Sequence, residues 1–165
     1  MKKLLIICML FSLQALGQAQ TVAIDKEKIF DLYQNQRYAE AGEYLKTSYG
    51  SETTDLKALT QIGYCFLMAG NNVEAQKYYA KADAIQPGNL PILFSLASIN
   101  TRRGNTEKAK LYYGNIVKLD SNNFIVYKLL ANLYLSDKDS LKMVYLLKAN
   151  KLVPTDGDVA ADLAA

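Results

Sequence analysis

The sequence predicts an all-α fold in which helix-turn-helix units stack into an α-solenoid. First, small and aromatic residues recur 34 positions apart, and a fixed period of this length is typical of solenoids. Second, no stretch shows sustained alternation of apolar and polar residues, so we expect no sheet. Third, 50% of the 165 residues are apolar and 21% are charged, which indicates one globular domain. The matched pairs are Gly70 with Gly104, Ala75 with Ala109, Tyr79 with Tyr113, and Asn89 with Asn123.

Residues 1–17 are predicted to form a secretory signal peptide. Two lysines precede an apolar run over residues 4–16, and small residues near its end suit cleavage before Gln18, with cleavage after Ala19 as the runner-up. The run is 13 residues long. A bilayer-spanning helix needs roughly 20, so an uncleaved anchor is the less favoured alternative. We therefore expect an exported protein, in the periplasm or at the outer membrane of a Gram-negative bacterium.

Turn and capping residues mark the helix boundaries in the rest of the chain. Pro87 ends one helix, and Asn89 begins the next with Pro91 in its first turn, where the missing N–H costs nothing. Gly104 ends that helix, and Asn105 begins another. The helices that we expect lie near residues 24–34, 37–48, 54–69, 72–85, 90–102, 106–118, 124–136 and 140–152.

The stretch from Leu56 to Asn89 carries the most specific pattern. Gly63 and Ala75 are small residues where two helices would cross closely, and larger apolar residues fill the space beside them. In this arrangement the stretch resembles a tetratricopeptide repeat, with leucine in place of the family's tryptophan. The matching positions are Leu59, Ile62, Gly63, Phe66, Ala75, Tyr79 and Pro87.

This resemblance covers roughly Val22 to Asp156 and implies one tetratricopeptide repeat domain over residues 18–165. It implies a right-handed stack of helix pairs whose first helices line a concave groove that holds peptides or partner proteins. The last repeat departs from the pattern, because Lys142 or Met143 occupies a place for a small residue, so we expect its two helices to sit further apart. Residues 157–165 are either a capping helix or the start of a truncated repeat. The expected repeats are residues 22–55, 56–89, 90–123 and 124–156.

The residues that face the groove are expected one helical step from the core positions of each first helix. Leu67, Met68 and Leu135 are interpreted as packing between repeats, whereas Tyr64 and Phe94 fit a core role and a groove role equally well. The resulting groove is amphipathic and nearly neutral, which suits an extended or helical peptide with an apolar anchor. The candidate groove residues are Thr60, Tyr64, Phe94, Ser98, Thr101, Lys128 and Asn132.

The sequence does not fit the carboxylate-binding groove that some members of this family have. Some members hold a C-terminal carboxylate with Lys and Asn one turn apart on one first helix, Asn on the next and two cations on a third. Lys128 and Asn132 match only the opening pair, and Asp162 stands where the next Asn is required.

The paired tyrosines Tyr78–Tyr79 and Tyr112–Tyr113 recur at the repeat period. We expect one tyrosine of each pair in the core between helices and the other on the convex side. No ligand site is needed to explain them.

Charge and composition exclude several function classes. Removing Lys2 and Lys3 with the signal peptide leaves 17 basic against 16 acidic residues, so a nucleic-acid partner is not expected. The chain has no histidine, the commonest general base and zinc ligand. Cys65 is interpreted as a buried small hydrophobe. We predict no catalytic residue, no metal site and no small-molecule cofactor.

The favoured hypothesis is a non-enzymatic adaptor that binds a protein or peptide partner within the bacterial envelope and contacts the membrane only through that partner. One alternative is the recognition portion of a larger envelope enzyme. Another is a structural protein that forms a homodimer by stacking its exposed repeat ends.

Overall fold

A computed structural model describes residues 23–134 and 140–165, and the predicted signal peptide lies outside them. All regular structure in these ranges is helical, so the predicted all-α solenoid is confirmed. Among the described helices, none combines the length and apolar character that a bilayer-spanning segment needs. The helices are α2 (Lys26–Gln34), α3 (Tyr38–Tyr49), α4 (Leu56–Met68), α5 (Asn72–Ile85), α6 (Leu90–Arg102), α7 (Thr106–Leu119), α8 (Phe124–Asn132), α9 (Ser140–Leu152) and α10 (Gly157–Ala164).

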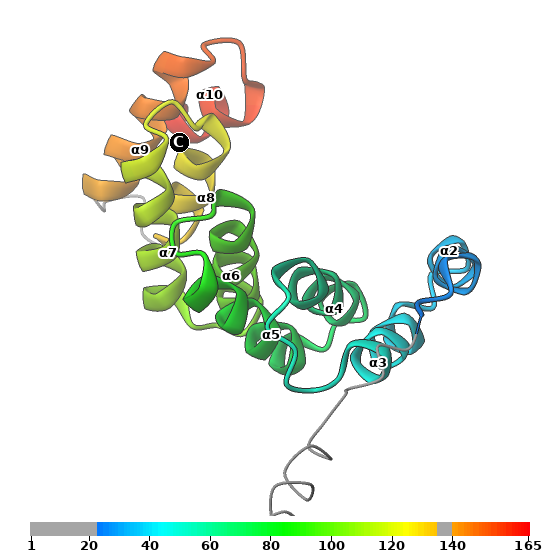
Figure 1. The fold of residues 1–165 in the computed structure, drawn as a ribbon. Helices are drawn as coiled ribbons and strands as arrows, with labels where there is room; N and C mark the ends of the chain where they lie inside the picture. Colours follow the sequence, from blue (N-terminus) through cyan, green and yellow to red (C-terminus); the bar gives the residue numbers. More distant parts are fainter. Residues whose placement is uncertain (1–22, 135–139) are drawn as a thin grey trace, which may run out of the picture.

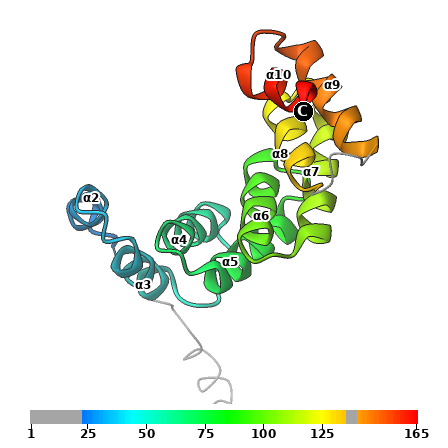
Figure 2. The ribbon, with the colours of Figure 1, turned by 180° about the vertical axis from the view of Figure 1, so that it is seen from behind.

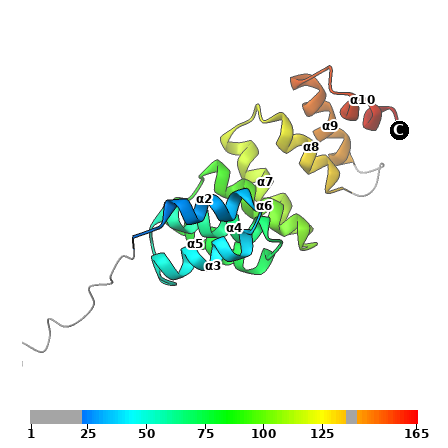
Figure 3. The same ribbon diagram turned by 90° about the vertical axis from the view of Figure 1, so that its right-hand side faces the viewer.

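The helices follow one another in antiparallel pairs along a curved path (Figure 1). Helices α4, α6 and α8 lie on the inner side of the curve, and α3, α5, α7 and α9 lie on its outer side. The view from behind shows the same division (Figure 2). Seen from the side, the C-terminal helices α8 to α10 rise away from the group formed by α2 to α6 (Figure 3). The solenoid therefore has a concave inner face and a convex outer face.

Three hydrophobic clusters follow one another along the solenoid instead of one central core. The first extends from α2 to α6, the second from α6 to α8, and the third from α8 to α10. Helix α6 contributes Leu96 and Ile99 to the first cluster and Leu93 and Ala97 to the second. Each repeat therefore buries its apolar surface against its neighbours, as expected for stacked repeats.

Side-chain caps fix where most of the helices begin. The Oδ1 atoms of Asp55, Asn89 and Asp156 accept hydrogen bonds from backbone N–H groups three residues later, at 2.8, 3.3 and 2.9 Å. Gly70 and Gly104, 34 positions apart, adopt φ of +77° and +72°, which side chains with a Cβ rarely adopt. The recurring asparagines and glycines of the sequence are therefore the structural signals of the repeat.

Most predicted boundaries agree with the structure within two residues, but the predicted helix 124–136 is wrong at its end. Helix α8 stops at Asn132. The N–H groups of Leu133 and Tyr134 bond to carbonyls three residues back, at Leu130 and Ala131 (3.0 and 3.1 Å). This tighter hydrogen bonding ends the α-helix although no glycine or proline marks the place.

Helices α4 and α5 cross closely at Gly63. A Cβ atom added there would lie 3.0 Å from Cδ2 and Cε2 of the Tyr79 ring, so only glycine fits without a shift. The interpretation that one residue of each tyrosine pair covers the convex side is wrong for α5, where Tyr78 is as buried as Tyr79. Tyr78 is buried because its ring stacks on Phe66, at 5.9 Å between centroids. In α7, Tyr113 is buried, and Tyr112 is half-buried and packs against both the first and the second cluster.

The first turn of α9 differs from the first turns of α5 and α7. Ala75 and Ala109 are fully buried in those two helices. In α9, Lys142 is half-buried and Met143 is 39% exposed, and no residue before Leu146 is buried. The last repeat therefore lacks the small buried contact near the start of its second helix.

Candidate partner-binding groove

Two neighbouring hollows on the inner side of the solenoid form the candidate site, which we call the inner groove. The larger, of about 360 Å³, lies between the first turns of α4 and α6. The smaller, of about 170 Å³, lies between α2 and α4, and Lys57 lines both. The larger is lined by Leu56, Lys57, Thr60, Tyr79, Asn89, Pro91, Ile92 and Ser95, and the smaller by Ile24, Lys26, Ile29, Leu45, Tyr49, Lys57 and Gln61.

The local sequence holds the groove walls in place. The Asp55 and Asn89 caps fix the starts of α4 and α6, so Lys57 and Pro91 each stand in a first turn. The Thr60 hydroxyl donates to the Leu56 carbonyl at 2.9 Å. This bond satisfies the hydroxyl within its own helix. The Thr60 hydroxyl is therefore not available to a ligand, and Thr60 offers the larger hollow mainly its methyl group.

Lys57 is the distinctive charge of the inner groove. Its ammonium group makes no hydrogen bond or ion pair with any described residue, and its side chain is exposed. Lys26 adds a second positive charge to the smaller hollow, and none of the residues lining either hollow is acidic. The nearby Asp55 carboxylate accepts the Ala58 N–H as a helix cap. A ligand carboxylate would therefore find an uncompensated ammonium between two apolar surfaces.

Of the predicted groove residues, Thr60 lines the larger hollow and Tyr64 lines neither. The Tyr64 ring is 41% exposed and meets the rings of Tyr33 and Tyr38 at 6.4 and 6.1 Å between centroids. These three tyrosines join α2, α3 and α4. Burial of the Tyr33 ring raises the pKa of its hydroxyl, so it stays protonated.

The predicted residues of α6 do not converge on the hollows either. Phe94 is half-buried and packs edge-to-face on Tyr113, with 6.2 Å between ring centroids. Ser98 is half-buried one turn further along. Thr101 is exposed near the helix end, and its hydroxyl donates to the Ala97 carbonyl at 3.0 Å. Phe94 therefore supports the second hydrophobic cluster.

Lys128 of α8 is bound within the chain. Its Nζ lies 3.0 Å from Oδ1 of Asp156 and 3.0 Å from Oδ2 of Asp158, at the start of α10. These bonds raise the pKa of Lys128, and they join the Val159 N–H in lowering the pKa of Asp156. Asn132 is exposed at the end of α8, and Leu135 lies outside the described residues. The charge of Lys128 is therefore compensated by α10.

Sequence reasoning missed Lys57, Pro91 and Ser95, although a signal for each of them was present. Lys57 and Pro91 stand 34 positions apart at the second position of their helices, and Lys57 precedes Thr60 by three residues. Residues three apart share a helix face, so the assignment of Thr60 to the groove predicts Lys57 there too. Ser95 likewise precedes the predicted Ser98 by three residues.

Cys65 is not part of a reactive site. Its side chain is fully buried, and its Sγ lies 3.2 Å from the Tyr33 hydroxyl. Burial raises the pKa of the thiol, so the reactive thiolate is disfavoured. The interpretation as a buried small hydrophobe is confirmed. In the part of the chain that the structure describes, no group of three or more potential ligands could hold a metal ion.

Comparisons with known proteins agree with this architecture. Residues 66–133 match the family model of the tetratricopeptide repeat. A structure of MamA from Desulfovibrio magneticus RS-1, beginning at its residue 41, superposes with a TM-score of 0.74 at 18% identity, covering 89% of this chain and 84% of that one. A tetratricopeptide repeat protein from Parabacteroides merdae superposes with a TM-score of 0.74 at 22% identity, covering 84% of this chain and 56% of that one.

A curated relative is an enzyme, the UDP-N-acetylglucosamine–peptide N-acetylglucosaminyltransferase of Caenorhabditis elegans. It is 36% identical over 84 residues, which are 51% of this chain but only 7% of the enzyme. The fold and the inner groove define a helical repeat protein with the architecture of an interaction scaffold. Within that class, the chain contains tetratricopeptide repeats, which the family model matches over residues 66–133.

Proposed function

We propose that this protein is a non-catalytic adaptor whose inner groove binds an extended segment of a partner protein. The observation that carries the proposal is the position of Lys57, an unpaired cation between two apolar hollows. The repeat fold supports it, because the curvature of such solenoids creates extended concave binding surfaces.

The chemistry of the inner groove specifies the segment. An acidic residue would pair with Lys57, and apolar side chains on either side of it would enter the two hollows. The apolar contacts would supply most of the binding free energy, and the ion pair would fix the register of the peptide. Lys26 would favour a second acidic residue at the end that lies over α2.

We further propose that the adaptor works in the bacterial envelope. The predicted signal peptide over residues 1–17 supports export, and contact with the membrane would then occur through the bound partner. Fractionation of cells that express the full chain checks this proposal. Recovery of the unprocessed chain from the cytoplasm would contradict it.

The experiment for the inner groove is a selection of random peptides displayed on phage against the full chain. We expect enrichment of peptides with one acidic residue flanked by apolar residues, and at least about tenfold weaker binding to the Lys57→Glu variant. The matched control is Lys77→Glu, a reversal of an exposed lysine on the outer side. Enriched peptides that bind wild type and Lys57→Glu equally would overturn the proposal.

A second candidate is the recognition portion of a larger enzyme. The observation that favours it is the 84-residue match to a small part of a glycosyltransferase. Under this proposal the inner groove would present a substrate protein to a catalytic partner. Co-purification of a transferase activity that is lost with Lys57→Glu would favour this candidate over a simple adaptor.

A further inference from the structure

The outer helices of the C-terminal half carry an excess of positive charge. Together α7 and α9 contain six lysines and one acidic residue, Glu107. Lys110 is paired with Glu107, at 3.0 Å. No described residue forms an ion pair or hydrogen bond with the ammonium groups of four other lysines, which are exposed. These four are Lys108, Lys118, Lys148 and Lys151.

Apolar side chains are exposed on the same two helices. Leu111 of α7 is 68% exposed, and Leu147 of α9 is 54% exposed. Leu141 and Val144 of α9 are about half exposed as well. Removing apolar side chains from water is favourable, so a partner that covers these residues would stabilise the complex.

A hollow of about 230 Å³ lies where α7, α8 and α9 meet, and we call it the outer groove. It is lined by Glu107, Lys110, Leu111, Gly114, Asn115 and Lys118 of α7, by Leu130 of α8 and Tyr134 after it, and by Tyr145 of α9. Lys110 lies over the ring of Tyr134, 3.9 Å from its centroid. The outer groove therefore combines an aromatic and aliphatic floor with one excess positive charge, because Glu107 balances Lys110 and leaves Lys118 without an acidic partner among the described residues.

Gly114 leaves the outer groove open. A Cβ atom added to Gly114 would meet no atom within 4 Å, so the chain does not need glycine there for packing. The equivalent position one repeat earlier is Ala80 of α5, which is exposed, whereas Gly114 is half-buried. In the interior of a helix glycine is less stable than alanine, and the space that it leaves is available to a ligand.

We propose that the outer groove binds an acidic amphipathic helix of a second partner protein. The apolar face of that helix would place one side chain over Gly114 and Tyr145 and cover Leu111, while its carboxylates would pair with Lys118 and Lys148. The charge of α7 and α9 selects an acidic partner. The recess between two helices favours a helix over an anionic bilayer, because a bilayer reaches the protruding leucines but not the floor.

The inner groove is lined by residues of α2 to α6 and the segments next to them, and the outer groove by residues of α7 to α9. The two share no lining residue, so both can be occupied at once. The outer groove does not depend on the proposed function of the inner groove. If both proposals are correct, the protein joins two partners.

The test uses a fluorescent synthetic helix with leucine at alternating third and fourth positions and glutamate elsewhere, titrated with the full chain. We expect binding that weakens with added salt, and at least about tenfold weaker binding to Gly114→Leu, which fills the outer groove. Lys118→Glu with Lys148→Glu should weaken binding similarly. Ala80→Leu, the same kind of change at the matched position of α5, should leave binding unchanged.

Three results would overturn the proposal. A control peptide with lysine in place of glutamate binds equally well, or Gly114→Leu keeps full affinity. Alternatively, the chain binds vesicles of phosphatidylglycerol and not the acidic helix. Circular dichroism of each variant confirms that it is folded, and Gly114→Leu is expected to fold because its new side chain points into open space. Because Lys57→Glu alters only the inner groove, its result is independent of these outcomes.

Discussion

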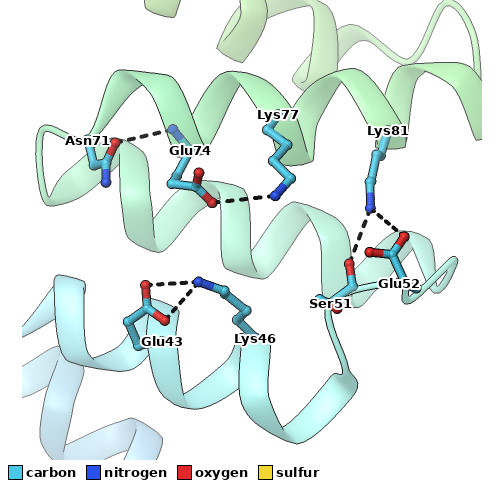
Figure 4. Close-up of polar contacts among 8 residues, drawn as sticks. All are labelled: Glu43, Lys46, Ser51, Glu52, Asn71, Glu74, Lys77 and Lys81. Atoms are coloured by element: carbon cyan, nitrogen blue, oxygen red, sulfur yellow. Dashed lines mark hydrogen bonds and ion pairs between the residues drawn. The ribbon is translucent and has the colours of Figure 1, made fainter.

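The outer faces of the N-terminal and C-terminal halves differ in how their charges are balanced. On α3 and α5, Lys46 pairs with Glu43 at 3.0 Å and Lys77 with Glu74 at 4.0 Å (Figure 4). Lys81 reaches Glu52 at 3.4 Å. On α7 and α9, four of the six lysines have no acidic partner among the described residues, although the two halves share the same repeat frame.

This comparison shows that the repeat frame and the outer surface vary independently. Exposed ion pairs contribute only about 0–1 kcal/mol each, so the pairs on α3 and α5 mainly neutralise a face that stays in water. The face of α7 and α9 keeps both its charge and its apolar surface. We interpret the first face as solvated and the second as built for contact.

The largest expected difference between the halves concerns apolar residues that look alike in the sequence. Ile62 is fully buried in the first cluster, so Ile62→Ala should lower the free energy of unfolding by about 3 kcal/mol. Leu147→Ala on the outer face of α9 should change it by less than about 0.5 kcal/mol. Urea denaturation measures both. A loss above about 2 kcal/mol for Leu147→Ala would mean that this face is packed within the folded chain.

One substitution should have opposite effects at two glycines. Gly63→Ala should cost about 1–2 kcal/mol, because the new methyl group meets the Tyr79 ring at 3.0 Å. Gly114→Ala should stabilise by about 0.5–1 kcal/mol, because it removes a flexible residue from a helix and meets no atom. Thermal unfolding of the two variants side by side checks the signs. Equal effects would show that α4 and α5 can move apart freely.

Tyr78→Phe and Tyr112→Phe compare the stability contributed by the same hydroxyl at equivalent positions of α5 and α7. The Tyr78 hydroxyl is buried and has no hydrogen-bond partner among the described residues, so removing it should stabilise the protein by about 1 kcal/mol. Tyr112→Phe, at the equivalent half-buried position, should be close to neutral. Chemical denaturation measures the difference. A clear loss of stability in Tyr78→Phe would indicate that a bound water satisfies the hydroxyl.

The smallest expected effect concerns an ion pair between helices. The pKa of Asp156 is lowered in the folded chain, so its charged form stabilises the fold. This contribution to stability is fully present above the ordinary aspartate pKa of about 3.9 and is lost as the pH falls through the lowered pKa. The protection of the Val159 amide against exchange, relative to an unstructured amide at the same pH, should therefore fall at low pH and at high salt. In Asp156→Asn, which keeps a capping residue, this dependence should disappear. An unchanged pH dependence in the variant would assign it to another group.

The 34-residue period and its asparagines and glycines predicted where α5, α6, α7, α8 and α9 begin. The end of α8 could not be predicted, because the tightened turn at Leu133 depends on hydrogen bonds and on no breaker residue. Whether an aromatic residue of a first helix lines a groove also depends on its neighbours in space. Tyr64 meets Tyr33 and Phe94 meets Tyr113, and neither contact follows from the spacing along one helix.

The inner groove was predictable in part. Helix geometry placed Thr60 on its wall, and the same geometry would have added Lys57. The ion pairs of Lys128 could not be predicted, because Asp156 stands 28 residues away and meets Lys128 only after α10 folds back. A charge on a predicted face therefore indicates a binding site only when its partners in space are known.

Helix α6 takes part in two of the three clusters, with Leu96 on one side and Leu93 on the other. Tension applied to the two ends of the solenoid would load these contacts in series, and each cluster could separate without waiting for the next. The chain would then extend in steps, with one cluster separating at a time. A protein held between two partners could in this way absorb a pull without losing its whole structure.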